Sequence, residues 1–300
     1  TAAINLALAL GLPGRQGSGW GCLTGQGNGQ GGREHGQKAD QLPGYRSVSD
    51  PVARAHVAQV WGVDPDDMPG PGVPAVELLG RLGTPGGVRG MFVHGSNLVV
   101  SAPNASEVER HLASLDLLVV SDLVLSETAK LATVVLPVTQ WAEEEGTMTN
   151  LEGRVLRRRR AVEPPDGVRD ELEVLAQLAS RLGAPGFTHD TADVFDELGR
   201  ASAGGRADYA GVSYERLDAG EALHWPVPYR DHPGTPRLFL DGFPTASGRA
   251  RMVAVDAAGV ADDVRLEAPL HLITGRVLPH YQSGAQTRRV TELREAEDAA

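Results

Sequence analysis

Polar side chains that could hold a ligand follow two apolar runs of the sequence. Ser121 and Asp122 come directly after the apolar run Leu117–Val120, and Asn97 comes shortly after a second run at residues 90–93. A carboxylate offers acceptor oxygens to a guanine edge or a ribose, and an amide suits a phosphate or a ribose. In open parallel sheets, ligands bind beyond the carboxyl ends of the strands. The alternative is structural, because Asp also caps helical turns and Asn is common in turns.

Asp170 and a set of residues near the end of the sequence also have side chains that could bind a ligand. Asp170 precedes a predicted helix at Glu171–Leu182, where Asp is an ordinary N-cap residue. That set follows a predicted strand at Leu270–Thr274, and its members are Thr274, Gly275, Arg276, Val277, Leu278, Pro279, His280, Tyr281, Gln282 and Ser283. Within this set Arg276 carries five fixed donors and suits a phosphate, whereas His280 either binds a ligand or packs beside Tyr281.

Residues 17–36 form a glycine-rich segment, with eight glycines between Gly17 and Gly32. Such segments approach ligands closely and form anion-binding nests of backbone N–H groups, although a flexible linker is the alternative. No Gly-Lys-Ser/Thr follows as in a Walker loop, and no strand precedes the segment as in the dinucleotide fingerprint. The single cysteine, Cys22, excludes a disulfide framework and a Cys-only metal site, and we expect it to be a small buried residue.

Two runs of like charge stand close together in the sequence. Glu143–Glu145 are consecutive carboxylates, which could share acid–base work or a divalent cation. Arg157–Arg160 are adjacent arginines, which could hold a polyanion. Consecutive side chains point in different directions, so we expect both runs to be solvated or ion-paired.

Apolar runs alternate with helical patterns along the middle of the chain. Strands are predicted at residues 90–93, 117–120 and 134–136, with helical segments at 105–114 and 126–132. This order predicts an α/β fold with a doubly wound, mostly parallel sheet. The other expected elements are helices Ala2–Leu10, Val52–Trp61, Val76–Leu82 and Thr191–Arg200, a strand Arg154–Val162 and a hairpin Phe239–Val255.

The composition excludes some classes of protein. The net charge is −11 and there is no basic stripe, which argues against a nucleic-acid partner. No apolar run reaches the roughly 18 residues of a membrane span. The first residues have the pattern of a helix interior rather than a signal peptide, and neither end of the chain carries a helix cap. We therefore expect a cytoplasmic chain that is part of a longer protein.

Residues 115–155 carry a long and specific pattern. It consists of Ser121-Asp122, Ser126-Glu127-Thr128-Ala129, Ala132-Thr133-Val134-Val135-Leu136-Pro137, Trp141 and Glu145-Gly146-Thr147-Met148-Thr149-Asn150-Leu151-Glu152-Gly153-Arg154. The pattern resembles the signature of the molybdopterin oxidoreductases, and the resemblance is strongest to the assimilatory nitrate reductases. Two positions depart from the family, which usually has Asp in place of Thr133 and Pro in place of Leu98.

The resemblance implies a domain organisation and a cofactor. It implies a molybdopterin oxidoreductase α/β domain at residues 1–183, an irregular connecting segment at 184–264, and the start of a C-terminal dinucleotide-binding β-barrel at 265–300. The cofactor implied is molybdenum bis(molybdopterin guanine dinucleotide). Asp170 aligns with a family residue that contacts the guanine of one dinucleotide.

The resemblance also places other residues on or near this cofactor. Asn97, Ser121 and Asp122 would bind it, residues 274–283 would lie along the pterins, and Asn28 in the glycine-rich segment would lie near it together with Gln26. Related periplasmic enzymes carry a Lys that contacts the cofactor at the position of Glu144. Because Glu144 does not match that residue, we do not assign this contact to it.

The implied reaction is the reduction of nitrate to nitrite, with electrons from a donor protein or reductase subunit. The molybdenum ligand and the ligands of a [4Fe–4S] cluster are expected outside this sequence, so no catalytic or metal-binding residue is assigned and the chain alone is expected to be inactive. The alternatives are a formate dehydrogenase-type member of the family and a non-catalytic scaffold subunit that has lost the cofactor.

Overall fold

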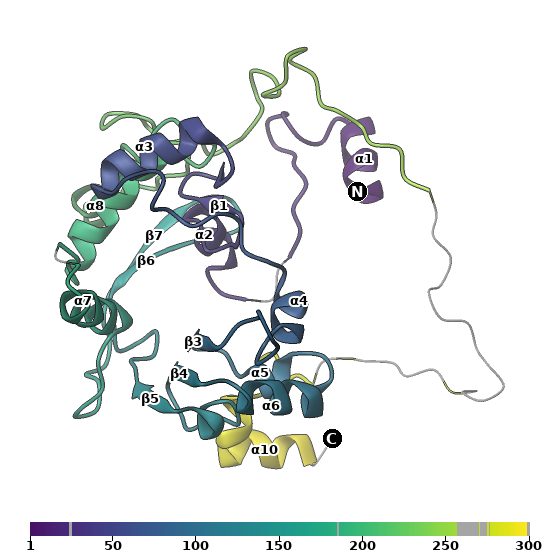
Figure 1. Cartoon of the computed structure of the whole chain (residues 1–300). Helices are drawn as coiled ribbons and strands as arrows, with labels where there is room; N and C mark the ends of the chain where they lie inside the picture. The colour runs from purple at the N-terminus through teal and green to yellow at the C-terminus, as the bar shows by residue number, and fades with distance from the viewer. Residues whose placement is uncertain (24–25, 185, 257–269, 271–274, 276, 299–300) are drawn as a thin grey trace. The chain divides into compact units, whose positions relative to one another are not determined.

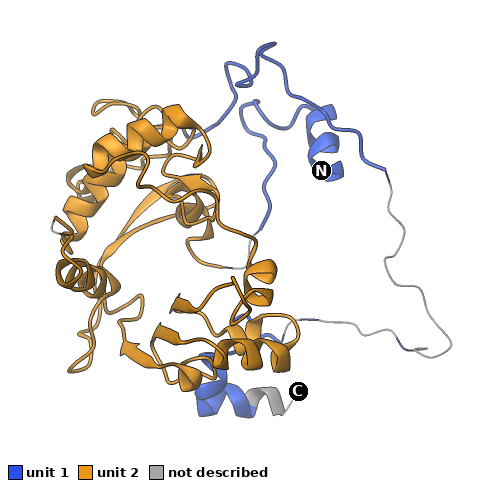
Figure 2. Cartoon of the chain, in the orientation of Figure 1, with its two compact units in different colours: residues 1–25, 236–300 blue, residues 26–235 orange. Residues whose placement is uncertain are grey.

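The structure is a computed structural model that describes residues 1–23, 26–184, 186–256, 270, 275 and 277–298. The chain divides into two units, which Figure 2 shows in different colours. Unit 1 is Thr1–Gly25 with Pro236–Ala300, and unit 2 is Gln26–Thr235. The domain boundaries expected after residues 183 and 264 stay a prediction.

Unit 2 contains a three-stranded parallel sheet with the strand order β3-β4-β5. The strands are β3 (Gly90–His94), β4 (Leu117–Asp122) and β5 (Val134–Pro137). β-Branched and apolar residues dominate the three strands, as expected of a parallel sheet. The register pairs His94 with Ser121 and Asp122 with Pro137, so the strands end at one edge of the sheet. The predicted α/β fold with a parallel sheet is confirmed.

Short helices pack against this sheet (Figure 1). They are α4 (Ala75–Gly80), α5 (Leu98–Ser101), α6 (Ala105–Ala113) and the 3-10 turn η1 (Ala129–Leu131). Val108 and Leu112 lie one turn apart on α6, which places both on the face toward the sheet. They are buried in one cluster with Leu118 and Val120 of β4. The sheet edge that carries the polar residues is thus held by an apolar core.

The rest of unit 2 has a second core around an antiparallel pair, β6 (Gly146–Thr149) and β7 (Val155–Arg158). Helices α7 (Glu171–Arg181), α8 (Thr191–Ser202) and α9 (Tyr214–Asp218) follow along the chain. Val155, Phe195, Tyr209, Leu217 and Trp225 are buried together in this core. The predicted strand Arg154–Val162 is shorter than expected, because the ladder with β6 ends at Arg158.

The first part of unit 2 contains a helix that the sequence predicted closely. Helix α3 (Pro51–Trp61) begins after Asp50, whose side chain accepts a hydrogen bond from Val52 N, and it ends at Gly62 in the left-handed region. Val57 and Ala58 are buried with Leu42 of the short pair β1 (Gln41–Leu42) and β2 (Arg46–Ser47). Capping residues with special backbone preferences therefore fixed both ends of α3.

The glycine-rich segment and the hairpin differ from expectation. Residues Gly29–Glu34 form a short helix, α2, within the segment expected to be loop. The predicted hairpin Phe239–Val255 is wrong, since the structure forms no strand there and only a turn, in which Phe243 N donates to Gly248 O at 3.1 Å. Gly242 and Pro244 interrupt the run, and Pro has no N–H to give to a ladder.

Unit 1 contains the helices α1 (Ala2–Ala9) and α10 (Thr291–Asp298) and the 3-10 turn η2 (Thr287–Arg289). Cys22 is exposed, so its predicted burial is wrong; it lies in a glycine-rich stretch outside any helix or strand, where the neighbouring residues Gly19, Trp20, Gly21 and Leu23 are exposed as well. The predicted strand Leu270–Thr274 lies outside the described residues except for Leu270. Among the helices that the structure describes, none has both the length and the apolar character needed to span a bilayer.

Candidate functional site

The polar residues predicted from the sequence gather at the carboxyl edge of the parallel sheet. Ser121 is fully buried at the end of β4, and its Oγ donates to Glu171 Oε1 at 2.7 Å. The same Oγ lies 3.1 Å from Nδ1 of His94, the last residue of β3. Glu171 is the first residue of α7. One buried hydroxyl thus joins the ends of two strands to the start of a helix.

Asn97 and Asp122 hold the loop that follows β4. Asp122 Oδ1 accepts from Leu123 N at 2.8 Å, and its Oδ2 accepts from Ser126 Oγ at 2.7 Å. Asn97 Oδ1 accepts from the backbone N and the hydroxyl of Thr128 at 3.2 and 3.0 Å. Two residues from different strand ends therefore fasten one loop, and each makes the local bonds that the structural alternative predicted.

Asp170 combines a capping role with a place on a cavity. Its Oδ1 accepts from Glu173 N at 2.7 Å, which caps α7 as predicted. Within the described part of the chain, its Oδ2 has no hydrogen-bond or ion-pair partner. Asp170 also lines a cavity of unit 2. It is therefore the predicted residue with a carboxylate oxygen left for a ligand.

This cavity has a volume of about 830 Å³ and lies between the start of α7, the start of α8 and the β6–β7 pair. Its polar walls include Glu144, Arg158, Asp170, Glu171 and Thr191. Asn97, Ser121 and Asp122 are not among its lining residues, so the structure brings Asp170 to the cavity and the other three to the sheet edge beside it.

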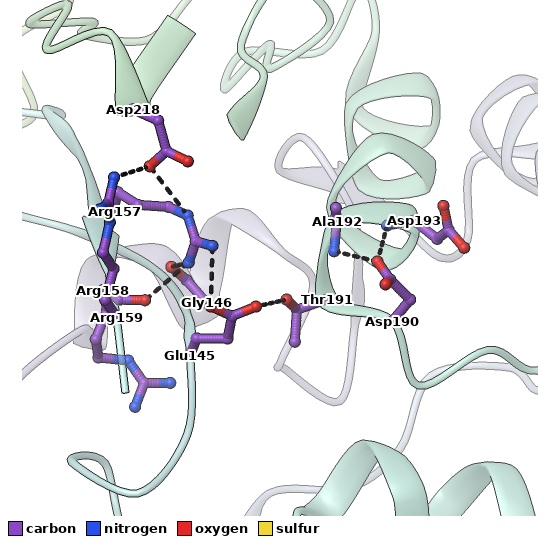
Figure 3. Close-up of polar contacts among 10 residues, drawn as sticks. All are labelled: Glu145, Gly146, Arg157, Arg158, Arg159, Asp190, Thr191, Ala192, Asp193 and Asp218. Carbon is purple, nitrogen blue, oxygen red and sulfur yellow. Dashed lines mark hydrogen bonds and ion pairs between the residues drawn. The ribbon is translucent and has the colours of Figure 1, made fainter. Parts of the chain in front are cut away.

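The two runs of like charge are joined by ion pairs, and both contribute residues to the lining of this cavity. Figure 3 shows the part of this network around Glu145 and Arg157. Arg157 Nη2 lies 3.1 Å from Glu145 Oε2, and Arg158 Nη2 lies 2.9 Å from Glu144 Oε1. Arg157 and Arg159 both contact Asp218 Oδ1, at 3.5 and 2.8 Å. The ion-paired interpretation of both runs is confirmed.

Arg157 is the centre of this network. Its side chain is 11% exposed, and its Nη1 donates to Gly146 O at 3.1 Å. The guanidinium lies 3.8 Å from the centre of the Tyr214 ring. Glu145 also accepts from Thr191 Oγ1 at 3.2 Å, next to the Asp190 cap of α8 (Figure 3). The network joins β6, β7, α8 and α9 around the cavity.

A buried carboxyl group near the cavity was missed in the sequence. Glu34 is fully buried; it accepts from Gln30 Nε2 at 2.8 Å and from the Tyr209 hydroxyl. Burial raises the pKa of Glu34, and hydrogen bonds from Tyr209 and Gln30 lower it in part. Burial also raises the pKa of Tyr209, and the charge of Glu34 adds to that shift. A signal was present in the sequence, since a charged pair, Arg33-Glu34, interrupts a glycine-rich segment.

Asn28 joins the glycine-rich segment to Thr149, which belongs to the family-like pattern at residues 115–155. Asn28 Oδ1 accepts from Thr149 N at 2.9 Å, and Thr149 Oγ1 lies 2.7 Å from the Tyr209 hydroxyl. His35, one residue after Glu34, lines the cavity, and burial lowers its pKa to about 4. Asn28 thus borders the cavity but its carbonyl oxygen is already bound within the protein.

The C-terminal set of predicted residues belongs to unit 1. His280 is buried, and its Nδ1 lies 3.1 Å from Thr287 Oγ1, which also accepts from Tyr281 N at 3.2 Å. Leu278 is 97% exposed, and Gly275, Val277, Gln282 and Ser283 are also exposed, with Pro279 half-buried. Thr274 and Arg276 lie outside the described residues.

Comparison with known proteins identifies the family. A family model of the molybdopterin oxidoreductases matches residues 1–181, which is more than half of the chain. The chain belongs to the molybdopterin oxidoreductase family. Membership implies a molybdenum–pterin cofactor. Among the described residues no group of three or more His, Cys, Asp or Glu side chains is arranged to hold a metal ion.

Several relatives match almost the whole chain. The assimilatory nitrate reductase catalytic subunit of Bacillus subtilis is 45% identical over 97% of this chain and 41% of its own length. The F420-dependent formate dehydrogenase subunit alpha of Methanocaldococcus jannaschii is 36% identical over 97% of this chain and 42% of its own length. The chain therefore spans about two fifths of the curated relatives it matches.

A solved structure is also similar. The acetylene hydratase of Pelobacter acetylenicus matches 56% of this chain and 24% of its own, at 22% identity and a TM-score of 0.41.

The walls of this cavity carry polar groups that suit a polar ligand such as this cofactor. The cavity has a volume of about 830 Å³, and Asp170 places an acceptor oxygen on its wall. Arg158 lies on the same wall, where it is paired with Glu144.

Proposed function

We propose that this protein is a molybdenum-dependent oxidoreductase that reduces nitrate to nitrite, with a bis(molybdopterin guanine dinucleotide) cofactor. One observation carries the choice of substrate: the nitrate reductase relative is 45% identical over 97% of this chain, against 36% for the formate dehydrogenase relative. The cofactor supplies the redox chemistry when bound, and the protein supplies binding, orientation and electrostatics.

The role of this chain is to hold the dinucleotide. Asp170 accepts hydrogen bonds from the guanine edge while its other oxygen caps α7. Asn97 and Asp122 bind the cofactor from the strand ends, where ligands of parallel sheets lie, and the fully buried Ser121 supports them from below. The segment from Gly275 to Ser283, with Thr274 and Arg276, binds the pterins and phosphates. We assign no residue of this chain as a ligand of a [4Fe–4S] cluster or of molybdenum, and the protein works in the cytoplasm with an electron-donor partner.

Oxidation of formate is the second candidate function. It is favoured by the formate dehydrogenase relative, which matches the same share of this chain as the nitrate reductase does. Both functions use the same cofactor, so the polar residues described above do not choose between them.

The test measures metal, nucleotide and turnover on the purified protein. We expect molybdenum by mass spectrometry, about twice as much GMP as molybdenum after acid hydrolysis, and nitrate reduction with reduced methyl viologen. Formate-dependent dye reduction without nitrate reduction would replace the first candidate by the second. A protein that contains neither molybdenum nor GMP would support the scaffold alternative and overturn both.

A further inference from the structure

We infer that Glu171 is a positioning residue for the cofactor. Glu171 fixes the start of α7 and thereby orients Asp170 toward the guanine. This inference rests on the proposed function, since it assigns Asp170 to the dinucleotide. The sequence did not single out Glu171, and its hydrogen bonds in the structure indicate this role.

The Glu171 carboxylate spans the ends of two paired strands. Its Oε1 accepts from Ser121 Oγ at 2.7 Å and lies 3.2 Å from His94 Nδ1. His94 and Ser121 are register partners at the ends of β3 and β4. A hydrogen bond to a charged acceptor is stronger than one between neutral groups, and here the donor is fully buried. The first residue of α7 is thus fastened to the sheet.

A second attachment lies on the other side of Asp170. Arg169 O accepts from Thr139 N at 3.1 Å, and Arg169 forms a parallel bridge with Val138, directly after β5. Asp170 therefore stands between a backbone attachment to the continuation of β5 and the Glu171 attachment to β3 and β4. Fixing both neighbours leaves the Asp170 side chain few directions.

Apolar packing holds α7 only in part. Within the described residues, no residue of α7 is fully buried; Leu172 and Val174 are half-buried, and Leu175 and Leu178 are exposed. A helix with little buried surface depends strongly on the contacts at its ends. The polar link through Glu171 is such a contact, and it joins the start of this helix to the sheet.

A nucleophile role for the same three residues does not fit the geometry. In a Ser-His-acid triad the serine hydroxyl donates to the histidine, and the acid orients the far side of the ring. Here Ser121 donates to Glu171, both contacts use the same His94 nitrogen, and Ser121 is fully buried. The cluster holds structure rather than attacking a substrate.

The test distinguishes the effect of side-chain length from the effect of negative charge at position 171. Glu171→Gln keeps the side-chain length and an acceptor oxygen but loses the charge. Glu171→Asp keeps the charge at the start of the helix, but its carboxylate is one methylene short of Ser121. We expect the Asp variant to lose molybdenum and GMP about five- to tenfold faster than wild-type holoprotein on incubation, because one hydrogen bond is lost. The Gln variant should stay within about twofold of wild type.

The outcomes are distinct. Loss of cofactor from the Gln variant with retention by the Asp variant would show that only the helix-start charge matters, and would overturn the positioning role. Retention by both variants would overturn it as well. Asp193→Ala, which removes a first-turn carboxylate of α8, is the matched control and should retain cofactor like wild type. Wild-type protein without molybdenum would overturn the proposed function itself, a result distinguishable from failure at Glu171 alone.

Discussion

At the scale of single residues, Asp170 is the sharpest test of the guanine contact. Asp170→Asn keeps an oxygen that accepts from Glu173 N, and Asn is as good an N-cap as Asp. It replaces Oδ2 by an NH₂ group, which faces the N–H donors of guanine with another donor. We expect a loss of GMP and molybdenum of about tenfold, with a thermal midpoint close to wild type.

Asp50→Asn is the matched control for this change. Asp50 caps α3 by accepting from Val52 N and does not line the cavity. Equal cofactor loss from the two variants would mean that capping rather than ligand binding explains the effect.

His35 makes the stability of the protein depend on pH. Burial lowers its pKa to about 4, below the ordinary value of 6.5. The folded state therefore resists protonation that the unfolded chain accepts, so this contribution to stability is complete above pH 6.5 and is lost as the pH falls toward 4. The loss is on the order of 3 kcal/mol.

His35→Phe should remove most of that dependence. His35 Nε2 is buried and has no hydrogen-bond partner among the residues that the structure describes, and the ring makes an edge contact with Tyr209 at 5.6 Å, which Phe can keep. Denaturant unfolding at pH 7 and pH 5 should show the variant gaining stability over wild type as the pH falls. Glu34 acts in the opposite direction, because its raised pKa favours the folded state in acid, so the difference between the two proteins is the quantity to compare.

At the scale of elements, the Arg157 network should hold the cavity wall together. Arg157→Ala removes hydrogen bonds to Gly146 and Glu145 and the contact with the Tyr214 ring, and it removes the packing of a side chain that is only 11% exposed. Because the acceptors Glu145 and Asp218 are exposed to solvent, we expect a moderate loss of about 1–3 kcal/mol in the free energy of unfolding.

Arg159 provides the control for this prediction. It pairs with the same Asp218 carboxylate as Arg157, but its side chain is 66% exposed. Exposed ion pairs contribute little, so Arg159→Ala should cost less than about 1 kcal/mol. Similar losses from the two variants would contradict a central role for Arg157.

The sequence predicted elements well where local chemistry determined them. The strand ends at Ser121-Asp122 and the caps at Asp50 and Asp170 follow from apolar runs and capping residues. The helix α2 was missed because glycine disfavours helices, and its stability comes from packing. The hairpin at Phe239–Val255 failed because Gly242 and Pro244 interrupt the run of strand-forming residues, and Pro has no N–H to give to a ladder.

At the scale of the whole molecule, the sequence predicted where these polar residues lie in the fold but not the long-range partners that they bind; their role in a site stays a prediction. Asn97, Ser121 and Asp122 lie at the strand ends, as parallel-sheet topology requires. Their partners come from residues such as Glu171, 50 positions from Ser121, and no local pattern reveals such a pairing. The bond between Glu34 and Tyr209 joins residues 175 apart, which likewise depends on the complete fold.

Helix α7 has a further consequence for how so large a prosthetic group could be installed. A segment with no buried side chains among the described residues costs little free energy to detach, whereas the sheet core beside it unfolds only with the whole unit. The wall that carries Asp170 is therefore the part of the cavity that opens most readily. Insertion there would proceed by local opening and reclosing, and the contacts of Glu171 with Ser121 and His94 would form again on closure.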